Sequence, residues 1–281
     1  MSSNESPVIT VVVAAYNCVD TIQQCIDSVV EQSYKKWELI VIDGGSTDGT
    51  ADLLGRNNEI SYWISEPDTG IYNAWNKALL KSTGDWICFL GGDDFLFDVQ
   101  ALDKMVGELN KLSVNVFVAY GRVMILNENS VPIYPVGERW ENVRKRFRYA
   151  MSIPHQGVMH RRDLFVKYGV FNESFRIGGD YDLLLRFLKN QDAVFFPDVI
   201  FSAMRLGGVS SNPSGTLLVL QEFRKAQINN GIRLPSIMFL FLVAKVYARI
   251  FIWRLLGERS AKRVLDIGRR LVRLPAHWTK V

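Results

Sequence analysis

The 281-residue sequence has few of the side chains that build disulfide frameworks or zinc sites, with only three cysteines and three histidines. Cys18, Cys25 and Cys88 form an odd set without a Cys-x-x-Cys spacing, which is typical of buried, reduced thiols in a cytosolic protein. Residues 1–7 are polar and lack the basic start and the apolar stretch of a secretory signal. We therefore expect a chain that stays in the cytoplasm.

Two common phosphate-binding motifs are absent as well. No Gly-x-Gly-x-x-Gly sequence follows the first apolar segment, and the chain has no Gly-Lys-Ser/Thr phosphate loop. These absences argue against the dinucleotide-binding fingerprint and against a P-loop nucleotide site. If the protein binds phosphate groups, a metal ion is the alternative means of neutralising them.

The sequence also lacks an uncharged apolar run long enough to span a bilayer, which takes about 20 residues. From Ile237 to Leu256 it is strongly apolar, but Lys245, Arg249 and Arg254 interrupt it. Lys245 and Arg249 stand four residues apart, on one face of a helix. The pattern predicts either an interfacial helix on an anionic membrane or a helix pair packed on the protein body, for example in a homodimer.

Charge is divided unequally along the chain, although the net charge is only +4. Residues 224–281 hold 13 Lys and Arg against two acids, a net of +11, which leaves residues 1–223 at −7. An acidic body argues against nucleic acid as a partner along its length, whereas a basic C-terminal region suits anionic lipid or, as the weaker alternative, nucleic acid.

The first hundred residues repeat a strand, a loop and a helix about every 25 to 30 residues. Four short, apolar segments have the composition of strands in a parallel sheet, and they lie at 8–14, 37–42, 60–64 and 86–90. Apolar residues at three- and four-residue steps predict helices between them. The alternation predicts an α/β fold with a mostly parallel, Rossmann-like sheet flanked by helices. Further along, strands are expected near 116–120 and 122–126.

Glycine-rich loops follow the strands and would gather at the carboxyl edge of the sheet, where open α/β sheets bind ligands. Asp93 and Asp94 follow the fourth strand, and Gly91 and Gly92 permit close approach of a ligand. Two adjacent carboxylates repel each other unless solvent, a proton or a cation relieves them. A divalent ion would do so and would fill its other positions with phosphate oxygens. Taken alone, an Asp-Asp pair is also typical of a solvated turn.

Four motifs, in order and spacing, resemble those of glycosyltransferase family 2, and the resemblance covers roughly residues 7–205. The motifs are VAAYN at 13–17, DGGSTDGT at 43–50, EPDTGIYNA at 66–74 and LGGDD at 90–94. The resemblance implies the GT-A fold, an activated sugar donor, Mn²⁺ or Mg²⁺, and transfer with inversion at the anomeric carbon.

The resemblance also implies roles for single residues. The donor-binding positions would be Ala15 and Tyr16 beside the nucleotide, Asp43 at its base, Asp68, and Asp93 at the ribose. Asp94 would bind the metal.

The segment GGDYDLLLR at 178–186 is similar to the family's acidic catalytic motif, and the aspartate aligned with Asp180 deprotonates the acceptor hydroxyl. A sugar hydroxyl is a weak acid, so its proton is best removed as the new bond forms. Gly179 stands where glutamate is common, which leaves the motif without a neighbouring acid. An aspartate at a helix start is also an ordinary cap, and Asp182 has the same two interpretations.

Three further residues are candidates for the acceptor side or for a mobile loop. His155 and Gln156 precede a short apolar strand where relatives approach the acceptor or the metal, although a lone histidine is usually structural. Arg205 begins RLGGVS at 205–210, a segment that could fold over the donor and bring Arg205 near phosphate. An ordinary surface turn is the alternative.

The resemblance, together with the basic apolar C-terminal region, implies a hexosyltransferase-type enzyme that adds one sugar, from a UDP-sugar by default, to a lipid-linked oligosaccharide in the synthesis of O-antigen, capsule or exopolysaccharide. We expect a GT-A catalytic domain at 1–215, with donor binding in about 7–115 and the acceptor part in about 116–215. A basic helical region at 216–281 would lie on the inner face of the cytoplasmic membrane. A metal-dependent nucleotidyltransferase and a non-catalytic membrane scaffold are the alternatives.

Overall fold

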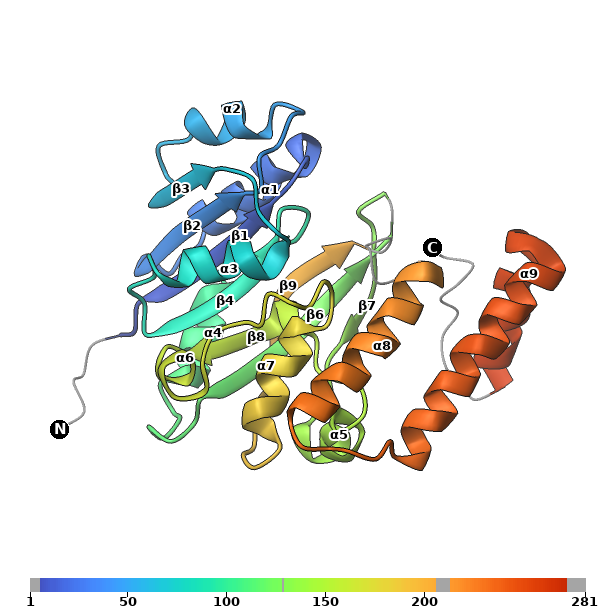
Figure 1. Ribbon diagram of the computed structural model, residues 1–281. Helices are drawn as coiled ribbons and strands as arrows, with labels where there is room; N and C mark the ends of the chain where they lie inside the picture. Colours follow the sequence, from blue (N-terminus) through green and yellow to red (C-terminus); the bar gives the residue numbers. More distant parts are fainter. Residues whose placement is uncertain (1–5, 128, 206–212, 272–281) are drawn as a thin grey trace.

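The computed structural model describes residues 6–127, 129–205 and 213–271. Its first elements are β1 (Ile9–Ala15), α1 (Val19–Val30), β2 (Trp37–Asp43), α2 (Thr50–Gly55), β3 (Tyr62–Ser65), α3 (Ile71–Leu79), β4 (Trp86–Gly91), β5 (Phe95–Leu96) and α4 (Ala101–Leu109). They are followed by β6 (Val118–Leu126), β7 (Pro132–Val136), α5 (Trp140–Phe147), the 3-10 helix η1 (His155–Gly157), β8 (Val158–Arg161), α6 (Asp163–Tyr168), α7 (Gly179–Leu188), β9 (Val194–Arg205), α8 (Pro213–Asn229) and α9 (Ile237–Leu271). Figure 1 shows their arrangement around one sheet.

The N-terminal part of this sheet is parallel. β1 lies between β2 and β4 and pairs with both in parallel, and β3 extends the sheet by pairing with β2. The residues of β1 from Ile9 to Val13 are completely buried, because helices cover both faces of the strand. The parallel α/β arrangement predicted for the first hundred residues is confirmed.

The sheet changes direction beyond β4. β8 pairs antiparallel with β4 and β6, whereas β6 and β9 pair in parallel. The two strands expected near 116–120 and 122–126 are one strand, β6, whose register against β9 shifts on either side of Arg122. A Cβ atom at Gly121 would lie 2.8 Å from the carbonyl oxygen of Val199, so this glycine allows the backbones of β6 and β9 to approach closely.

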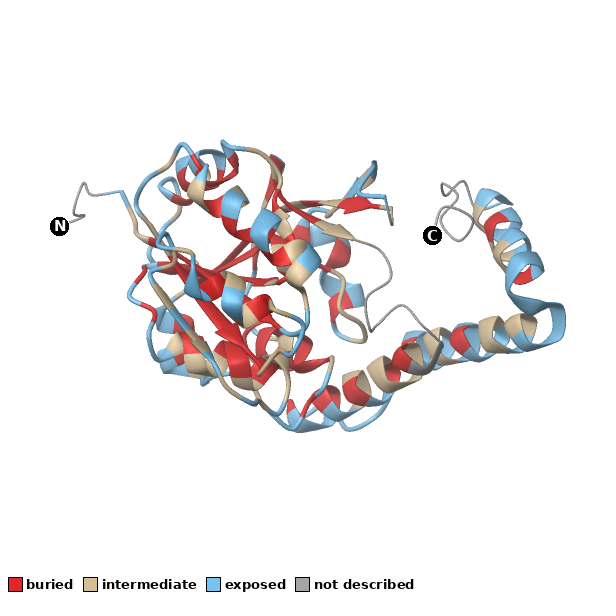
Figure 2. Cartoon of the chain, turned by 90° about the horizontal axis from the view of Figure 1, so that it is seen from above, coloured by how far each residue is buried: buried red, intermediate tan, exposed pale blue. Residues whose placement is uncertain are grey.

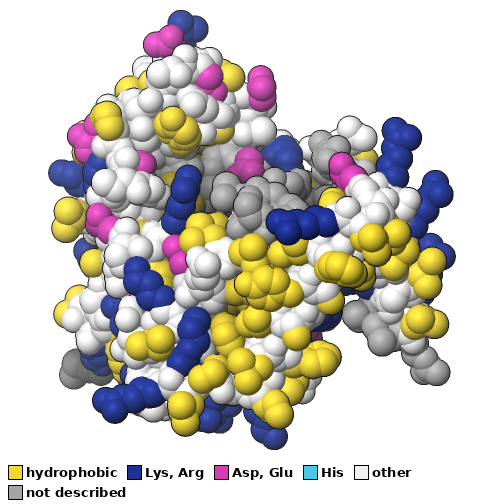
Figure 3. All heavy atoms as spheres, turned by 45° about the vertical axis from the view of Figure 1, so that its right-hand side comes forward, with side chains coloured by type: hydrophobic (Ala, Val, Ile, Leu, Met, Phe, Trp, Pro, Cys, Tyr) yellow, Lys and Arg dark blue, Asp and Glu magenta, His cyan; other side chains and the backbone are white. Residues whose placement is uncertain are grey.

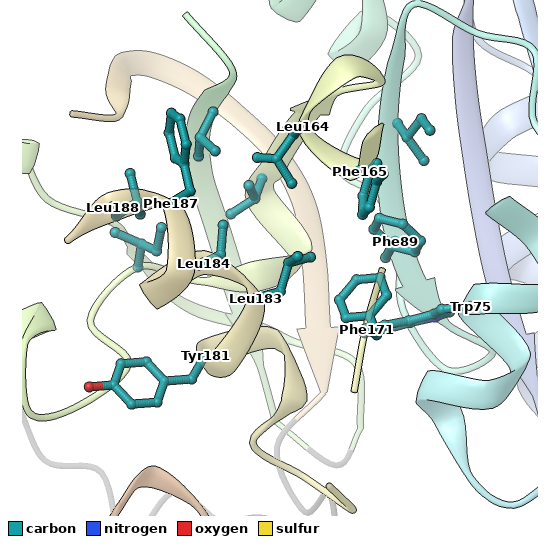
Figure 4. Close-up of a cluster of buried hydrophobic side chains, with 14 of the residues drawn as sticks. Trp75, Phe89, Leu164, Phe165, Phe171, Tyr181, Leu183, Leu184, Phe187 and Leu188 are labelled. Carbon is teal, nitrogen blue, oxygen red and sulfur yellow. The ribbon is translucent and has the colours of Figure 1, made fainter. Parts of the chain in front are cut away.

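Alternating side chains of the strands divide the core into two layers. Val11 and Val13 of β1 face α1 and α4, whereas Val12 belongs to the layer under α3, α5 and α7. Figure 4 shows part of this second layer, where the rings of Trp75, Phe89, Phe165 and Phe171 gather beside leucines of α7. Both faces of the sheet are therefore covered, and its carboxyl edge is left for the polar loops.

The C-terminal region is helical, as predicted. α8 packs against α7, and α9 packs against α8 through Phe239 and Val246, which meet Leu220. Gly257 has φ 70° and ψ 169°, which breaks α9 into two helices. Figure 2 shows the second of them lying beyond the main body. Within the described ranges, no helix is both long and apolar enough to cross a membrane.

Candidate functional site

The predicted donor-binding residues converge because neighbouring parallel strands end together. Ala15 at the end of β1 lies opposite Asp43 at the end of β2, and Ala14 lies opposite Gly91 at the end of β4. The loops after β2 and β4 begin in the same way, because the N–H groups of Gly44 and Gly92 donate to the carbonyl oxygens of Ala15 and Ala14 in β1, each at 2.9 Å. The structure thus brings the loops after β1, β2 and β4 to one edge.

Asp43 is completely buried and well bound by the protein itself. Its Oδ2 accepts hydrogen bonds from the N–H groups of Gly45 at 3.2 Å and Ser46 at 2.9 Å and from the hydroxyl of Ser65 at 2.6 Å. Its Oδ1 accepts the Ser46 hydroxyl. A carboxylate offers about four acceptor positions. A ligand N–H can therefore bind Asp43 only by displacing one of these donors, and a serine hydroxyl can rotate away.

Asp68 and Tyr16 border the same loops. A Cβ atom at Gly44 would lie 2.7 Å from Oδ2 of Asp68, so the missing side chain lets this carboxylate approach the end of β2. Oδ1 of Asp68 accepts the N–H of Gly70 at 2.9 Å, which fixes the turn before α3. The Tyr16 ring is 66 % exposed and is available to a ligand.

Asp94 is buried, whereas its neighbour Asp93 is exposed. Burial, and next the charge of Asp93, raise the pKa of Asp94 to about 7. Its Oδ2 accepts the N–H of Gly91 at 3.0 Å, and the side chain of Gln156 also binds it. Among the residues that the structure describes, Asp94 forms no salt bridge. The carboxylate is thus a buried negative charge whose compensation is incomplete.

Arg205, at the end of β9, lies beside the acid pair. Its guanidinium donates to the carbonyl oxygen of Asp93 and to the side chain of Gln24, and its Nε donates to the Ser130 hydroxyl at 3.1 Å. The structure therefore brings the predicted Arg205 to Asp93, while residues 206–210 of the expected loop lie outside the described residues.

His155 and Gln156 are neighbours in η1 but have different surroundings. The Gln156 side chain binds Asp94, whereas the buried His155 ring stacks on Trp75 at a centroid distance of 5.1 Å. Burial, and next the nearby His160, hold the pKa of His155 well below its usual value. His155 is therefore an uncharged member of the aromatic core at neutral pH, and the structure brings only Gln156 to the acid pair.

Asp180 is the second residue of α7 and is partly buried. Its Oδ1 accepts the N–H of Tyr181 at 2.7 Å and faces the Tyr72 hydroxyl at 3.4 Å. Burial is the main reason that the pKa of Asp180 is raised to about 6, and the charge of Glu222 adds to it. A carboxylate with this pKa is ionised at neutral pH and accepts a proton more readily than an ordinary aspartate.

Asp182, two residues further along α7, is bound inside the protein. Its Oδ1 accepts the side-chain amide of Asn230 at 3.2 Å, and its Oδ2 lies 3.4 Å from Nε of Arg186. Burial raises the pKa of Asp182. The contact with Asn230 joins α7 to the end of α8.

Sequence reasoning missed Tyr72 and Glu222, which both contact the segment before Asp180. Tyr72 belongs to the motif at 66–74, but nothing in the motif indicates a contact 105 residues away, where its hydroxyl binds the carbonyl oxygen of Ile177. Glu222 lies in the C-terminal region and accepts backbone N–H groups at 176–178.

Comparison with known proteins identifies relatives of this chain. The family model described as Glycosyl transferase family 2 matches residues 10–167. A PGL/p-HBAD biosynthesis glycosyltransferase of Mycobacterium tuberculosis is 28 % identical over 247 residues, which cover 83 % of this chain and 90 % of that protein. An uncharacterized glycosyltransferase of the same species is 32 % identical over 186 residues, or 64 % of this chain and 69 % of that protein.

Solved structures show the same fold. The mannosyltransferase PcManGT from Pyrobaculum calidifontis, in complex with GDP-Man and Mn²⁺, has a TM-score of 0.64 at 17 % identity and covers 96 % of this chain and 81 % of its own. S. aureus TarS residues 1–349, in complex with UDP, has a TM-score of 0.61 at 17 % identity and covers 94 % of this chain and 77 % of its own.

The mixed sheet and these fold neighbours define an α/β protein with the GT-A fold, as the sequence predicts. The chain belongs to glycosyltransferase family 2, whose model matches more than half of its length.

Proposed function

We propose that this enzyme transfers one sugar from a nucleoside diphosphate sugar to a hydroxyl group of a lipid-linked saccharide, with inversion at the anomeric carbon. The observation that carries the proposal is Asp94, a buried carboxylate with a raised pKa at the carboxyl edge of the sheet. Such a charge is stabilised by a divalent cation, and the diphosphate of a sugar donor needs the same cation.

The residues present fit a metal ion that the donor helps to bind. Asp94 would supply one carboxylate, with Asp93 next to it, and the described residues contain no group of three or more His, Cys, Asp or Glu that could hold a metal ion by themselves. The remaining positions would belong to phosphate oxygens and water, as Mg²⁺ and Mn²⁺ accept. The ion would stabilise the charge of the departing diphosphate.

This arrangement predicts that metal and nucleotide bind cooperatively. Mn²⁺ with UDP should raise the melting temperature more than the sum of the two separate effects, because the phosphate oxygens of UDP would complete the coordination of the metal. A ligand at 100 times its Kd adds about 2.7 kcal/mol to the unfolding free energy. UDP, GDP and dTDP are to be compared in a thermal shift assay. UDP is our default, and PcManGT and TarS were solved with GDP-Man and UDP. No shift with any nucleotide would contradict the proposed donor class.

Donor recognition would use the loops at the sheet edge. Ala15 and Tyr16 would border the nucleotide, Asp43 would accept an N–H group of the base in place of one of its serine donors, and Asp68 would lie beside it. Asp93 would face the ribose. Arg205 carries a positive charge next to Asp93, and we assign it to the donor phosphates.

We assign the acceptor proton to Asp180. Tyr181 and Tyr72 face its Oδ1, so Oδ2 is the oxygen that would take the proton as the acceptor hydroxyl attacks the anomeric carbon. The bond between that carbon and the diphosphate oxygen breaks as the new glycosidic bond forms. The products are the glycoside and a nucleoside diphosphate, whereas a nucleotidyltransferase would release pyrophosphate.

The pKa of Asp180 sets the expected pH dependence. Because the ionised form is the base, activity is present above a pKa of about 6 and is lost as the pH falls through it. We expect kcat at saturating donor and Mn²⁺ to fall about tenfold per pH unit below that value. Initial rates from pH 4.5 to 8.5 test this. Enzyme samples held at each pH are then assayed at pH 7.5 to exclude irreversible inactivation. A flat profile would rule out Asp180 as the base.

The proposed lipid-linked acceptor would lie in a membrane, and α9 has an exposed surface that suits membrane binding. Its exposed side opposite α8 carries Leu240, Phe241, Tyr247, Phe251 and Leu255. Figure 3 shows hydrophobic side chains gathered over the C-terminal helices, with Lys and Arg around them. An apolar stripe flanked by cations is typical of a helix that lies in the interface of an anionic membrane.

The inner face of α9 is held by the protein. Arg249 donates to the Thr216 hydroxyl of α8 at 2.7 Å, and Phe239 and Val246 are buried. Near the start of α9, Lys145, Arg148 and Lys189 line a pocket and add positive charge. Packing on the body and binding to a membrane are therefore compatible, because they use opposite faces of the helix. We propose a peripheral enzyme on the inner face of the cytoplasmic membrane, in the synthesis of a surface polysaccharide.

Liposome flotation tests the membrane proposal. The variant Phe241→Ser/Phe251→Ser should bind phosphatidylglycerol vesicles at least about tenfold more weakly, because each exposed ring loses favourable burial in lipid. Leu80→Ser is the matched control, since Leu80 is an exposed apolar residue of the body, at 85 % exposure. If the wild type fails to float and is instead a dimer that the double variant dissociates, the apolar stripe is a homodimer interface.

A further inference from the structure

Glu222 of α8 is an acid buried against the catalytic segment. It is 6 % exposed, and its carboxylate accepts three backbone N–H groups. Oε1 accepts the N–H of Arg176 at 2.7 Å, and Oε2 accepts those of Ile177 at 2.8 Å and Gly178 at 2.7 Å. These donors lead directly into α7, whose N-cap residue Gly178 has no side chain to cap it. Glu222 supplies the negative charge that a helix start favours.

The peptide groups of Ile177 are held from two sides. Glu222 accepts its N–H, while the Tyr72 hydroxyl of α3 donates to its carbonyl oxygen. The same hydroxyl lies 3.4 Å from Oδ1 of Asp180. The position of Asp180 therefore depends on α3 and α8, which contact one short segment from different parts of the chain.

Two glycines make these contacts possible. A Cβ atom at Gly178 would lie 3.1 Å from Cβ of Glu222, and a Cβ atom at Gly179 would lie 2.7 Å from the Tyr72 ring. No larger residue fits at 179 unless the ring moves. The glutamate that the resemblance leads one to expect at 179 thus has no room, and the nearby carboxylate comes from α8 instead.

We propose that Glu222 is a positioning residue for sugar transfer, which holds the backbone at 176–178 so that Asp180 faces the acceptor hydroxyl. The inference rests on the proposed role of Asp180 as the base. Glu222 does not touch the reacting atoms and acts through three peptide N–H groups. It makes α8 a part of the catalytic machinery.

Electrostatics supports the same assignment. Asp180 is faced by the Tyr72 hydroxyl from α3, by the N–H of Tyr181 on its own helix, and by the charge of Glu222 from α8. The first two lower the pKa of Asp180, and Glu222 raises it. Removing the charge of Glu222 should therefore shift the acid side of the kcat profile to lower pH, which a purely structural role would not do.

The central experiment measures Glu222→Gln, in which one oxygen becomes an NH₂ group that faces backbone N–H donors. We expect kcat to fall about 10- to 100-fold, with an unchanged donor KM, an unchanged thermal shift by Mn²⁺ and UDP, and the acid side of the pH profile at lower pH. Gln221→Ala, at the exposed neighbouring position, is the control and should match the wild type. An unchanged kcat and profile would overturn the proposal.

Two more variants cover other outcomes. Tyr72→Phe removes the second support of Ile177 and, combined with Glu222→Gln, should lower kcat by less than the product of the single effects. If Glu222→Gln does not fold, Glu222→Asp, which keeps the charge but is one methylene group too short to hold all three N–H groups, must lower kcat at an unchanged donor KM, or the proposal fails. Asp180→Asn is measured in parallel. Full activity of that variant refutes the proposed base, whereas an inactive Asp180→Asn beside a normal Glu222→Gln refutes only the role of Glu222.

Discussion

Asp180→Asn should lower kcat by about 10²- to 10⁴-fold, the range in which general base catalysis contributes. The amide has the same shape and can still accept the N–H of Tyr181, which donates to Asp180 at 2.7 Å. It cannot take a proton from the acceptor. Transfer should therefore fail at the chemical step, while UDP and Mn²⁺ raise the melting temperature as they do in the wild type.

Stability distinguishes this result from misfolding. Burial raises the pKa of Asp180 to about 6, so the folded state disfavours the ionised carboxylate that is present at pH 7.5. The neutral amide does not carry this cost, and the variant should be at least as stable as the wild type at that pH. Asp198→Asn, at an exposed carboxylate of β9, is the control for activity. If Asp180→Asn kept more than a tenth of the normal kcat, another residue would have to be the base.

Asp94→Asn should have opposite effects on activity and on stability. We expect a loss of at least about 100-fold in kcat/KM and no cooperative stabilisation by Mn²⁺ and UDP, because the amide is a poor ligand for a hard cation. Without ligands, however, the variant should melt at a higher temperature than the wild type at pH 8. Both effects follow from one buried charge.

The sign of the stability effect follows from the pKa of Asp94, which is raised to about 7. Between about pH 4 and 7 the folded state binds more protons than the unfolded state, so the stability of the wild type falls as the pH rises. Above pH 7 the folded protein carries the full cost of burying the ionised Asp94 carboxylate. One pKa unit corresponds to about 1.4 kcal/mol. The amide makes weaker hydrogen bonds to Gly91 and Gln156, which offsets part of the gain. We therefore expect the free energy of unfolding of Asp94→Asn to exceed that of the wild type by about 1–3 kcal/mol at pH 8 and to equal it near pH 4.

Calorimetry at pH 4, 6 and 8 measures this difference. A gain of a few degrees in the melting temperature at pH 8 corresponds to about 1 kcal/mol for a domain of this size. A variant that is destabilised equally at every pH would show that the Asp94 carboxylate is satisfied in the free protein, which would remove the main support for the metal site.

Local sequence patterns predict the strands and loops that meet at the carboxyl edge of the sheet, and the structure shows these strand ends side by side. The strands ending at Ala15, Asp43 and Gly91 are short apolar runs followed by glycine-rich loops, and parallel pairing then brings their ends together. The buried face of α1 follows from the spacing of its apolar residues. These features depend on neighbours within a few positions, which a sequence shows directly.

Features formed by distant residues could not be predicted in the same way. Gly121 marks an apparent break in the pattern, yet it lies inside one strand and allows close contact with β9. Glu222 accepts hydrogen bonds from backbone N–H groups that lie 44 to 46 positions away in the sequence, and Gln156 of η1 binds Asp94, which follows β4. Nothing in local spacing encodes such pairings. The roles assigned to the donor and acceptor residues remain predictions.

Gly257 has a practical consequence for the preparation of shorter proteins. A chain that ends at residue 215 would remove Glu222 and Asn230 and leave Asp182 without its amide partner, so we expect it to be poorly folded. A chain that ends at residue 256 keeps α8 and the apolar first half of α9 but removes the exposed Arg259, Arg263 and Arg270. The bend at Gly257 is thus a natural end point for a crystallisable catalytic unit.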